Sequence, residues 1–257
     1  MLEQRSIRIR LAGRVSVEIG ESLVDQAEFP GIQGRIAFAF LAAERSRPVT
    51  RAELIEALWP ADAPPSCEGA LNSIISKLRT LLARAGLDPS VTLVGASACY
   101  ELRLPACAWV DLEAAADAIH EAEVALRAGD PGRAYGPSAV AHHIARRPFL
   151  PGAEGPWIDT WRRRLHTILL RALECRGEIY LWNHEFSLAV EAANELLAIE
   201  PLRESGHRLL IKGLAGAGNT AEALSAYERC RRLIARQLGV DPSQQTKAVY
   251  EAVLASV

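Results

Sequence analysis

The sequence predicts a mainly α-helical protein with two domains: a winged helix-turn-helix of mixed α+β structure over residues 1–107, and an all-α, tetratricopeptide-like helical-repeat domain over residues 108–257. Three observations predict this. Strand-like alternation of apolar and polar residues lies on both sides of three helical segments in the first domain. Beyond Asp111, alanine-rich helical segments alternate with short Gly and Pro breaks. Two of these segments repeat at a spacing of about 34 residues.

The N-terminal strands are predicted by alternation alone. Apolar side chains alternate with polar ones over residues 7–11 and again over residues 15–19, which indicates a half-buried hairpin. A helix over about residues 34–44 follows, with an apolar side that can cover the hairpin.

Two more helices and a second hairpin complete the first domain. Thr50 and Glu53 form a capping box, and the helix that they begin ends at Pro60. Ser66 is placed to cap the next helix, which runs to about residue 85. Short β-runs at residues 91–94 and 100–104 are predicted to form the wing.

The third of these helices is the candidate DNA-reading element. Its apolar residues form a single stripe of about 120°: Leu71, Ile74, Ile75, Leu78, Leu81 and Leu82. The rest of its surface carries hydroxyls flanked by an amide and cations: Ser73, Ser76, Thr80, Asn72, Arg79, Lys77 and Arg84. A helix in the major groove turns short polar groups toward bases and cations toward phosphates. A solvated face on an ordinary core helix is the alternative that this pattern leaves open.

The repeat in the second domain aligns Ala189 with Ala223 and Phe186 with Thr220. Small residues let paired helices approach closely, and this period is typical of stacked helical hairpins that leave a groove. Contact with another protein or oligomerisation is the expected role, and a purely structural domain is the alternative.

Composition excludes several classes of protein. With 49% hydrophobic and 23% charged residues, the chain is neither disordered nor collagen-like. No apolar run approaches the roughly 18 residues of a membrane-spanning helix. Because the net charge is −2, a basic surface for nucleic acid can only be a small patch and not the whole protein. Five scattered cysteines favour a reducing cytoplasm, and Met1–Arg5 shows no signal peptide.

Three other motifs that resemble functional sites are predicted to have only structural roles. Residues 213–220 lack the lysine and the preceding strand of a phosphate loop, so a turn between helices is predicted. Adjacent His142 and His143 point to different sides of a helix, so we expect surface histidines and no metal site. The basic run at residues 161–164 is predicted to be a solvated face. No catalytic motif is present, so neither enzymatic activity nor a cofactor is expected.

Segments of both domains resemble AfsR/SARP-type bacterial transcriptional activators. In the first domain they are RPVTRAELIEALWP (residues 47–60) and ALNSIISKLR (70–79); in the second they are WVDLE (109–113), PLRE (201–204), ALSAYE (223–228) and LGVDPS (238–243). The resemblance implies a sequence-specific regulator of promoter DNA, an activator that recruits RNA polymerase at direct repeats. In such a protein, Arg35 and Arg51 are expected to hold backbone phosphates.

Two features depart from the family pattern. Members carry basic residues just before the first helix, where Arg35 is the only cation of residues 30–35. The wing tip, normally Gly-Gly-Tyr and a basic residue, reads Ala98-Cys99-Tyr100-Glu101. Since each lost phosphate contact weakens binding, a homodimer or polymerase contacts are expected to rescue a weakly binding monomer. Alternatives are a helical-repeat interaction or ligand-sensing protein whose winged helix does not bind DNA, and the N-terminal part of a longer regulator.

Overall fold

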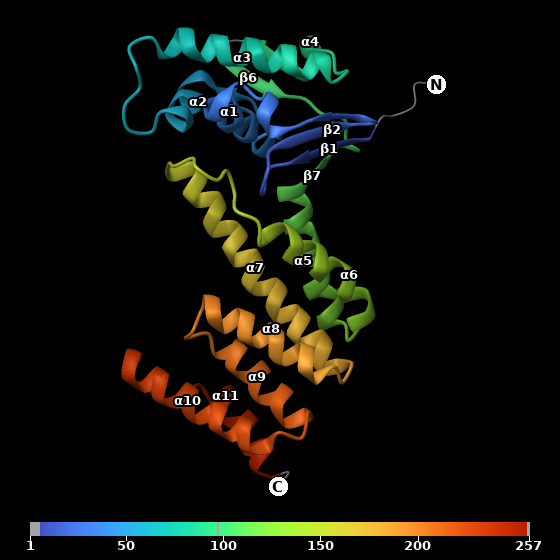
Figure 1. The fold of residues 1–257 in the computed structure, drawn as a ribbon, viewed down its shortest axis with the longest axis vertical. Helices are drawn as coiled ribbons and strands as arrows, with labels where there is room; N and C mark the ends of the chain where they lie inside the picture. The colour runs from blue at the N-terminus through green and yellow to red at the C-terminus, as the bar shows by residue number, and fades with distance from the viewer. Residues whose placement is uncertain (1–5, 97, 256–257) are drawn as a thin grey trace. The chain divides into compact units, whose positions relative to one another are not determined.

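The computed structural model describes residues 6–96 and 98–255 (Figure 1). Contacts divide the chain into two compact units, one of Met1–Ala116 with Ile144–His166, the other of Asp117–His143 with Thr167–Val257. The domain boundary between residues 107 and 108 stays a prediction, and Met1–Arg5, where no signal peptide is expected, lies outside the described residues. None of the helices in the described ranges combines the length and the hydropathy needed to cross a membrane.

The first unit combines two small sheets with three main helices, which confirms the predicted winged-helix order. Its elements are β1 (Ile7–Arg10), β2 (Ser16–Ile19), β3 (Ser22–Val24), the short 3-10 turn η1 (Gln26–Glu28), α1 (Gly31–Ala43), β4 (Val49–Thr50), α2 (Arg51–Leu58), α3 (Cys67–Arg84), α4 (Pro89–Thr92), β5 (Leu93–Ala96), β6 (Cys99–Leu102) and β7 (Trp109–Val110). One sheet has the order β3-β2-β1-β7, in which β7 is parallel to β1; the other has the antiparallel order β4-β6-β5.

Helix α1 forms the centre of this unit. All residues from Ile36 to Ala42 are buried, and both α2 and α3 pack against this helix. The start of α7 (Pro156–Trp182) also joins this core, because the Trp157 ring lies 4.7 Å from the Phe40 ring. Residues far along the chain therefore complete the core of the N-terminal unit.

A buried carboxylate fastens the first hairpin to the chain that follows the wing. Asp111 is 1% exposed, and its Oδ2 accepts the backbone N–H groups of Leu11 and Ala12 at 2.8 and 2.9 Å. Burial raises the pKa of Asp111 to about 6, against the opposing effect of these hydrogen bonds and of the Arg147 charge. The Asp111 side chain thus holds the turn after β1 in place, although burial disfavours its charged form.

The second unit is entirely helical. The domain predicted to be all-α over residues 108–257 is helical except for the short strand β7 (Trp109–Val110) at its start. The second unit contains the larger parts of α5 (Asp111–Arg127), α6 (Pro131–Ala145) and α7, followed by α8 (Phe186–Ile199), α9 (Glu204–Gly216), α10 (Thr220–Leu238) and α11 (Gln244–Leu254). The predicted repeat is confirmed, because α8 and α10 begin at the aligned residues Phe186 and Thr220. Helix α9 packs against α8, α10 and α11. A Cβ at Gly213 would lie 2.9 Å from Val190, so only glycine permits this approach of α9 to α8.

Two local predictions in the first unit are wrong. Val91 and Thr92 belong to the helical turn α4 and not to a strand, because Asp88 accepts the Ser90 N–H at 2.9 Å and Pro89 begins the turn. Ser66 makes no capping hydrogen bond, because its backbone is not in the extended conformation that caps use.

Two side chains predicted to face solvent, His142 and Arg162, instead make polar contacts within the protein. His142 is only 7% exposed and lies 3.3 Å from Glu195 Oε1 and 3.4 Å from Arg176 Nη1, whereas His143 is exposed. Arg162, in the basic run at residues 161–164, donates hydrogen bonds to the carbonyl groups of Phe149, Leu150 and Ala153. Arg162 therefore closes the loop before α7, while Arg163 and Arg164 are exposed.

Asp111→Asn is expected to remove a pH dependence of stability. The raised pKa means that folding favours the protonated acid, so the free energy of unfolding of the wild type should rise as pH falls through the folded pKa. As pH falls from 7 to 5, the free energy of unfolding of the wild type should rise by about 1 kcal/mol more than that of Asp111→Asn. This follows from about 1.4 kcal/mol for each unit by which the pKa differs between the folded and unfolded states. Urea unfolding at each pH measures this, and parallel pH profiles of the two proteins would contradict it.

Candidate DNA-binding surface

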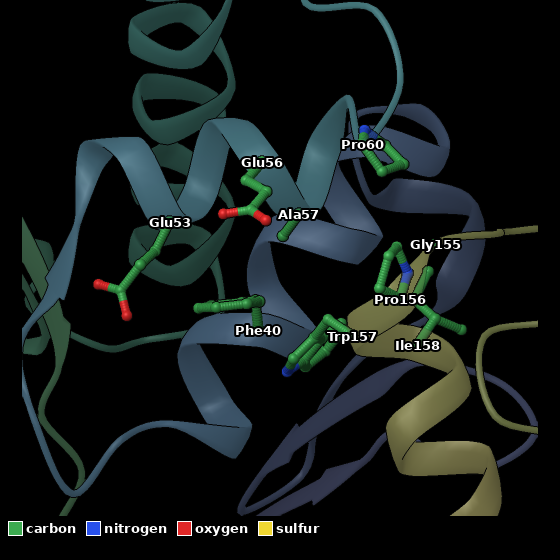
Figure 2. A pocket seen from close by; sticks show the side chains of 9 residues that line it. All are labelled: Phe40, Glu53, Glu56, Ala57, Pro60, Gly155, Pro156, Trp157 and Ile158. Atoms are coloured by element: carbon green, nitrogen blue, oxygen red, sulfur yellow. The ribbon is translucent and has the colours of Figure 1, made fainter.

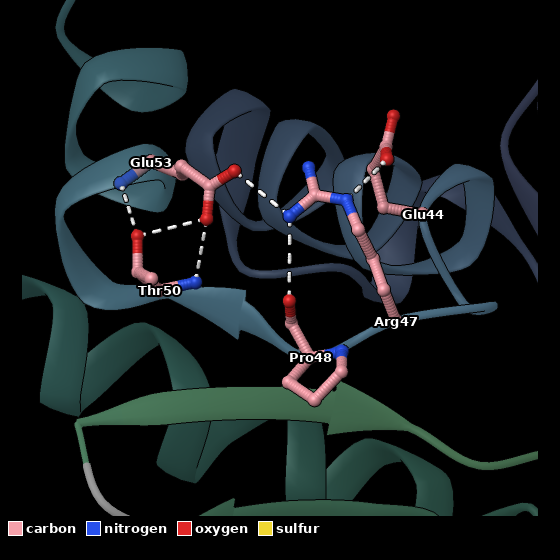
Figure 3. Close-up of polar contacts among 5 residues, drawn as sticks. All are labelled: Glu44, Arg47, Pro48, Thr50 and Glu53. Atoms are coloured by element: carbon pink, nitrogen blue, oxygen red, sulfur yellow. Dashed lines mark hydrogen bonds and ion pairs between the residues drawn. The ribbon is translucent and has the colours of Figure 1, made fainter.

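The beginning of α2 is held by a reciprocal cap, as the sequence predicts (Figure 3). Thr50 Oγ1 accepts the Glu53 N–H at 3.2 Å, and Glu53 Oε2 accepts the Thr50 N–H at 2.8 Å. Arg47 adds an ion pair of 2.8 Å to the other Glu53 oxygen. These hydrogen bonds, the one from the Thr50 backbone above all, lower the pKa of Glu53. The cap fixes where α2 begins.

The apolar stripe of α3 is buried as predicted. All six of its residues are at most 7% exposed, and Leu71 and Leu78 are fully buried. This burial fixes the rotation of the helix about its axis, since α3 packs against α1 and α2 (Figure 1). The polar residues are consequently held on the outer side.

Most of the predicted polar face of α3 is exposed: Asn72, Ser73, Ser76, Lys77, Thr80 and Arg84. The Thr80 hydroxyl donates to the Ser76 carbonyl at 3.1 Å, which leaves its oxygen able to accept. Lys77 and Arg84 have no hydrogen bond or ion pair among the described residues. Together with Ser76 and Thr80 they line a shallow hollow, whose other side includes Glu28 and Pro30.

Arg51 joins the beginnings of α2 and α3 to the wing. Its guanidinium contacts the Glu68 carboxylate, donates to the Tyr100 hydroxyl at 2.5 Å and donates to Asn72 Oδ1 at 2.9 Å. The hydrogen bond with Glu68 raises the pKa of Arg51. The sequence predicts that Arg51 holds a backbone phosphate and that Asn72 helps to position the helix on DNA. The structure brings the two side chains together in one network with an acidic partner, Glu68.

Arg79 clamps α3 to the wing. Its Nε and Nη2 donate to the Leu93 carbonyl at 3.1 and 3.0 Å, and the side chain is half-buried. Arg35 lies apart from these networks, half-buried on α1, with no hydrogen bond or ion pair in the described part of the chain. Of the cations predicted to contact DNA, only Lys77 and Arg84 are exposed and uncommitted, that is, without a hydrogen bond or ion pair to any described residue.

Two residues of the wing, Tyr100 and Glu101, have polar partners that were not predicted from the sequence. Tyr100 is buried, yet its hydroxyl reaches Arg51 and lies 3.4 Å from Asn72 Oδ1. Glu101, expected to place a negative charge near phosphates, forms an ion pair of 2.7 Å with Arg103. That pairing reduces the repulsion expected from the acid. The i, i+2 spacing of Glu101 and Arg103 in the β-run predicted over residues 100–104 was the signal available in the sequence.

The sequence profile of the bacterial transcriptional activator domain matches residues 110–254. The chain belongs to the bacterial transcriptional activator domain family. This match covers more than half of the chain, and the predicted resemblance to AfsR/SARP-type regulators is confirmed by the relatives.

The family relatives are longer regulatory proteins. Regulatory protein AfsR of Streptomyces coelicolor is 36% identical over 86% of this chain, and that of Streptomyces griseus 32% over 97%. Transcriptional regulatory protein EmbR of Mycobacterium tuberculosis is 30% identical over 86% of this chain. The chain spans 22% and 24% of the two AfsR proteins and 57% of EmbR.

A solved structure shares the fold. It is titled "Mycobacterium tuberculosis EmbR in complex with low affinity phosphopeptide", and the two structures align with a TM-score of 0.86 at 26% identity. The alignment covers 98% of this chain and 66% of that one. The order along the chain, a winged helix followed by a helical domain, is therefore shared with the EmbR structure.

Ala98→Gly is expected to stabilise the N-terminal unit. Ala98 has a φ of 64°, in the left-handed region that costs an alanine about 1 kcal/mol or more, and the family pattern places glycine at this tip. Glycine's greater freedom in the unfolded chain offsets part of that gain. The net increase in the free energy of unfolding should be about 0.5 kcal/mol, measured by urea unfolding, with Ala96→Gly as the control that should not stabilise.

Proposed function

We propose that this chain is a sequence-specific, double-stranded DNA-binding transcriptional activator. Helix α3 carries the proposal, because its apolar stripe is buried while hydroxyl side chains and two uncommitted cations share its exposed face. Ser73, Ser76 and Thr80 would contact base edges in the major groove. Lys77 and Arg84 would contact the flanking phosphates. The family membership supports this role.

The structure changes the part proposed for two other cations, Arg79 and Arg51, and for the amide side chain of Asn72. Arg79 and Arg51 position the wing and α3 through the Leu93 carbonyl and Tyr100, so their effect on DNA binding is indirect. Asn72 accepts from Arg51 in the same network, and as an exposed residue it can still donate to DNA through its amide nitrogen. Arg35 remains a proposed phosphate contact on α1.

The helical unit is proposed to contact RNA polymerase or a second copy of the chain. A groove over α8, α9 and α10 supports a protein partner, with an apolar floor of Val190, Leu210 and Leu214. Arg229 and Asn194 line the same groove and are exposed. An apolar centre with polar groups around it is typical of surfaces that bind another protein.

One observation favours the alternative of an interaction protein whose winged helix does not bind DNA. The acids Glu28 and Glu68 lie beside the exposed residues of α3, and Glu68 already neutralises Arg51. Selection of genomic DNA fragments by the purified chain at two salt concentrations distinguishes the two functions. Enrichment of a repeated site supports the activator, and no enrichment at low salt supports the alternative.

Lys77→Ala with Arg84→Ala is expected to weaken binding to all DNA sequences alike. Each phosphate contact contributes about 0.9 to the slope of log affinity against log salt, so losing two should flatten the slope by roughly two. The control is Lys212→Ala with Arg236→Ala, which removes the same charge from exposed positions on α9 and α10. Fluorescence anisotropy at several salt concentrations measures both slopes. An unchanged slope in the α3 variant would overturn the placement of these contacts.

A further inference from the structure

A pocket on the N-terminal unit lies on helices other than α3. It is formed by α1, α2 and the start of α7, all within one compact unit, and encloses about 180 Å³ (Figure 2). Two aromatic rings, Phe40 and Trp157, lie on one side, and Pro60 and Pro156 lie at the other end. None of the residues proposed to contact DNA lines it.

The rings and prolines make the interior of this pocket apolar. The centroids of the Phe40 and Trp157 rings are 4.7 Å apart and the rings are tilted by 42°. Phe40 is buried, and Ala57 beside it presents only a methyl group. A flat, apolar group of about one ring in size would fill this space, because the pocket is smaller than the roughly 300 Å³ and more that holds a drug-sized molecule.

Only one of the two acids that line the pocket is uncommitted. The Glu53 carboxylate accepts the Thr50 N–H and pairs with Arg47 (Figure 3). In Figure 2 the Glu53 side chain points away from the prolines, whereas Glu56 extends beside Ala57 toward the Phe40 ring. Glu56 is exposed and has no hydrogen bond or ion pair with any described residue. A negative charge is therefore available at the mouth of an aromatic pocket.

We infer that this pocket binds a small organic cation, an amine carried on a single aromatic or alicyclic ring. The ring would lie against Phe40 and Trp157, and the ammonium group would pair with Glu56. Aromatic faces attract cations as well, so both features select the same charge. A carboxylate ligand of the same size would be repelled by Glu56.

The inference is tested with three probes of similar size and different charge: phenethylamine, 2-phenylethanol and phenylacetate. Binding to the full chain is followed by NMR shifts of the Glu56 and Ala57 amide groups, because a probe this small is expected to bind weakly. Phenethylamine should bind saturably and about fivefold more tightly than 2-phenylethanol, the contribution of an exposed ion pair. Phenylacetate should bind most weakly of the three.

Two variants locate the interaction. Glu56→Gln should bring the affinity for phenethylamine down to that of the alcohol. Glu191→Gln, a matched change at an exposed position of α8, should leave the affinity unchanged. Ala57→Leu should fill the pocket and abolish binding of every probe, with circular dichroism confirming that it folds. Equal binding of the three probes, no saturable binding, or an unchanged affinity in Glu56→Gln would each overturn the inference. None of these readouts depends on DNA binding, so they are independent of the proposed function.

Discussion

Six apolar side chains on one side of α3 are buried, and this burial fixes the orientation on which the rest of the winged helix depends. At about 1.5–3 kcal/mol for each fully buried large side chain, the stripe contributes roughly 10 kcal/mol to the packing of this helix. A rotation by one residue would expose leucines and bury Lys77. The exposed hydroxyls, the wing clamp of Arg79 and the Asn72 contact of Arg51 all follow from that single orientation.

Features set by local periodicity could be predicted from the sequence. The α3 stripe, the Thr50–Glu53 cap and the repeat that begins at Phe186 and Thr220 each depend on residues close together or regularly spaced. The error at Val91 arose because a short apolar run suits a strand or a helical turn equally well, and Asp88 with Pro89 decides in favour of the turn.

Features set by contacts between distant residues could not be predicted. Arg51 meets Tyr100, which is 49 positions away, and Arg79 meets a wing carbonyl 14 positions away. His142 is buried because Glu195 and Arg176, on other helices, supply polar partners. A helical wheel shows which way such a side chain points, but not what it meets. The sequence therefore could not distinguish the cations proposed to contact DNA, such as Lys77 and Arg84, from those that support the wing, Arg51 and Arg79.

The way the N-terminal unit is completed has a consequence for its biosynthesis. Strand β1, at the start of the chain, pairs with β7, and Ala12 forms a β-bridge with Phe149. Trp157 then supplies a ring to the same core. A ribosome must therefore deliver most of the first 166 residues before this unit can close, although its sheets and helices up to residue 102 are already made. The nascent chain exposes the edge of β1 until residues 109–110 are made, and the face of Phe40 until Trp157 is made. These are the surfaces at which a chaperone would act.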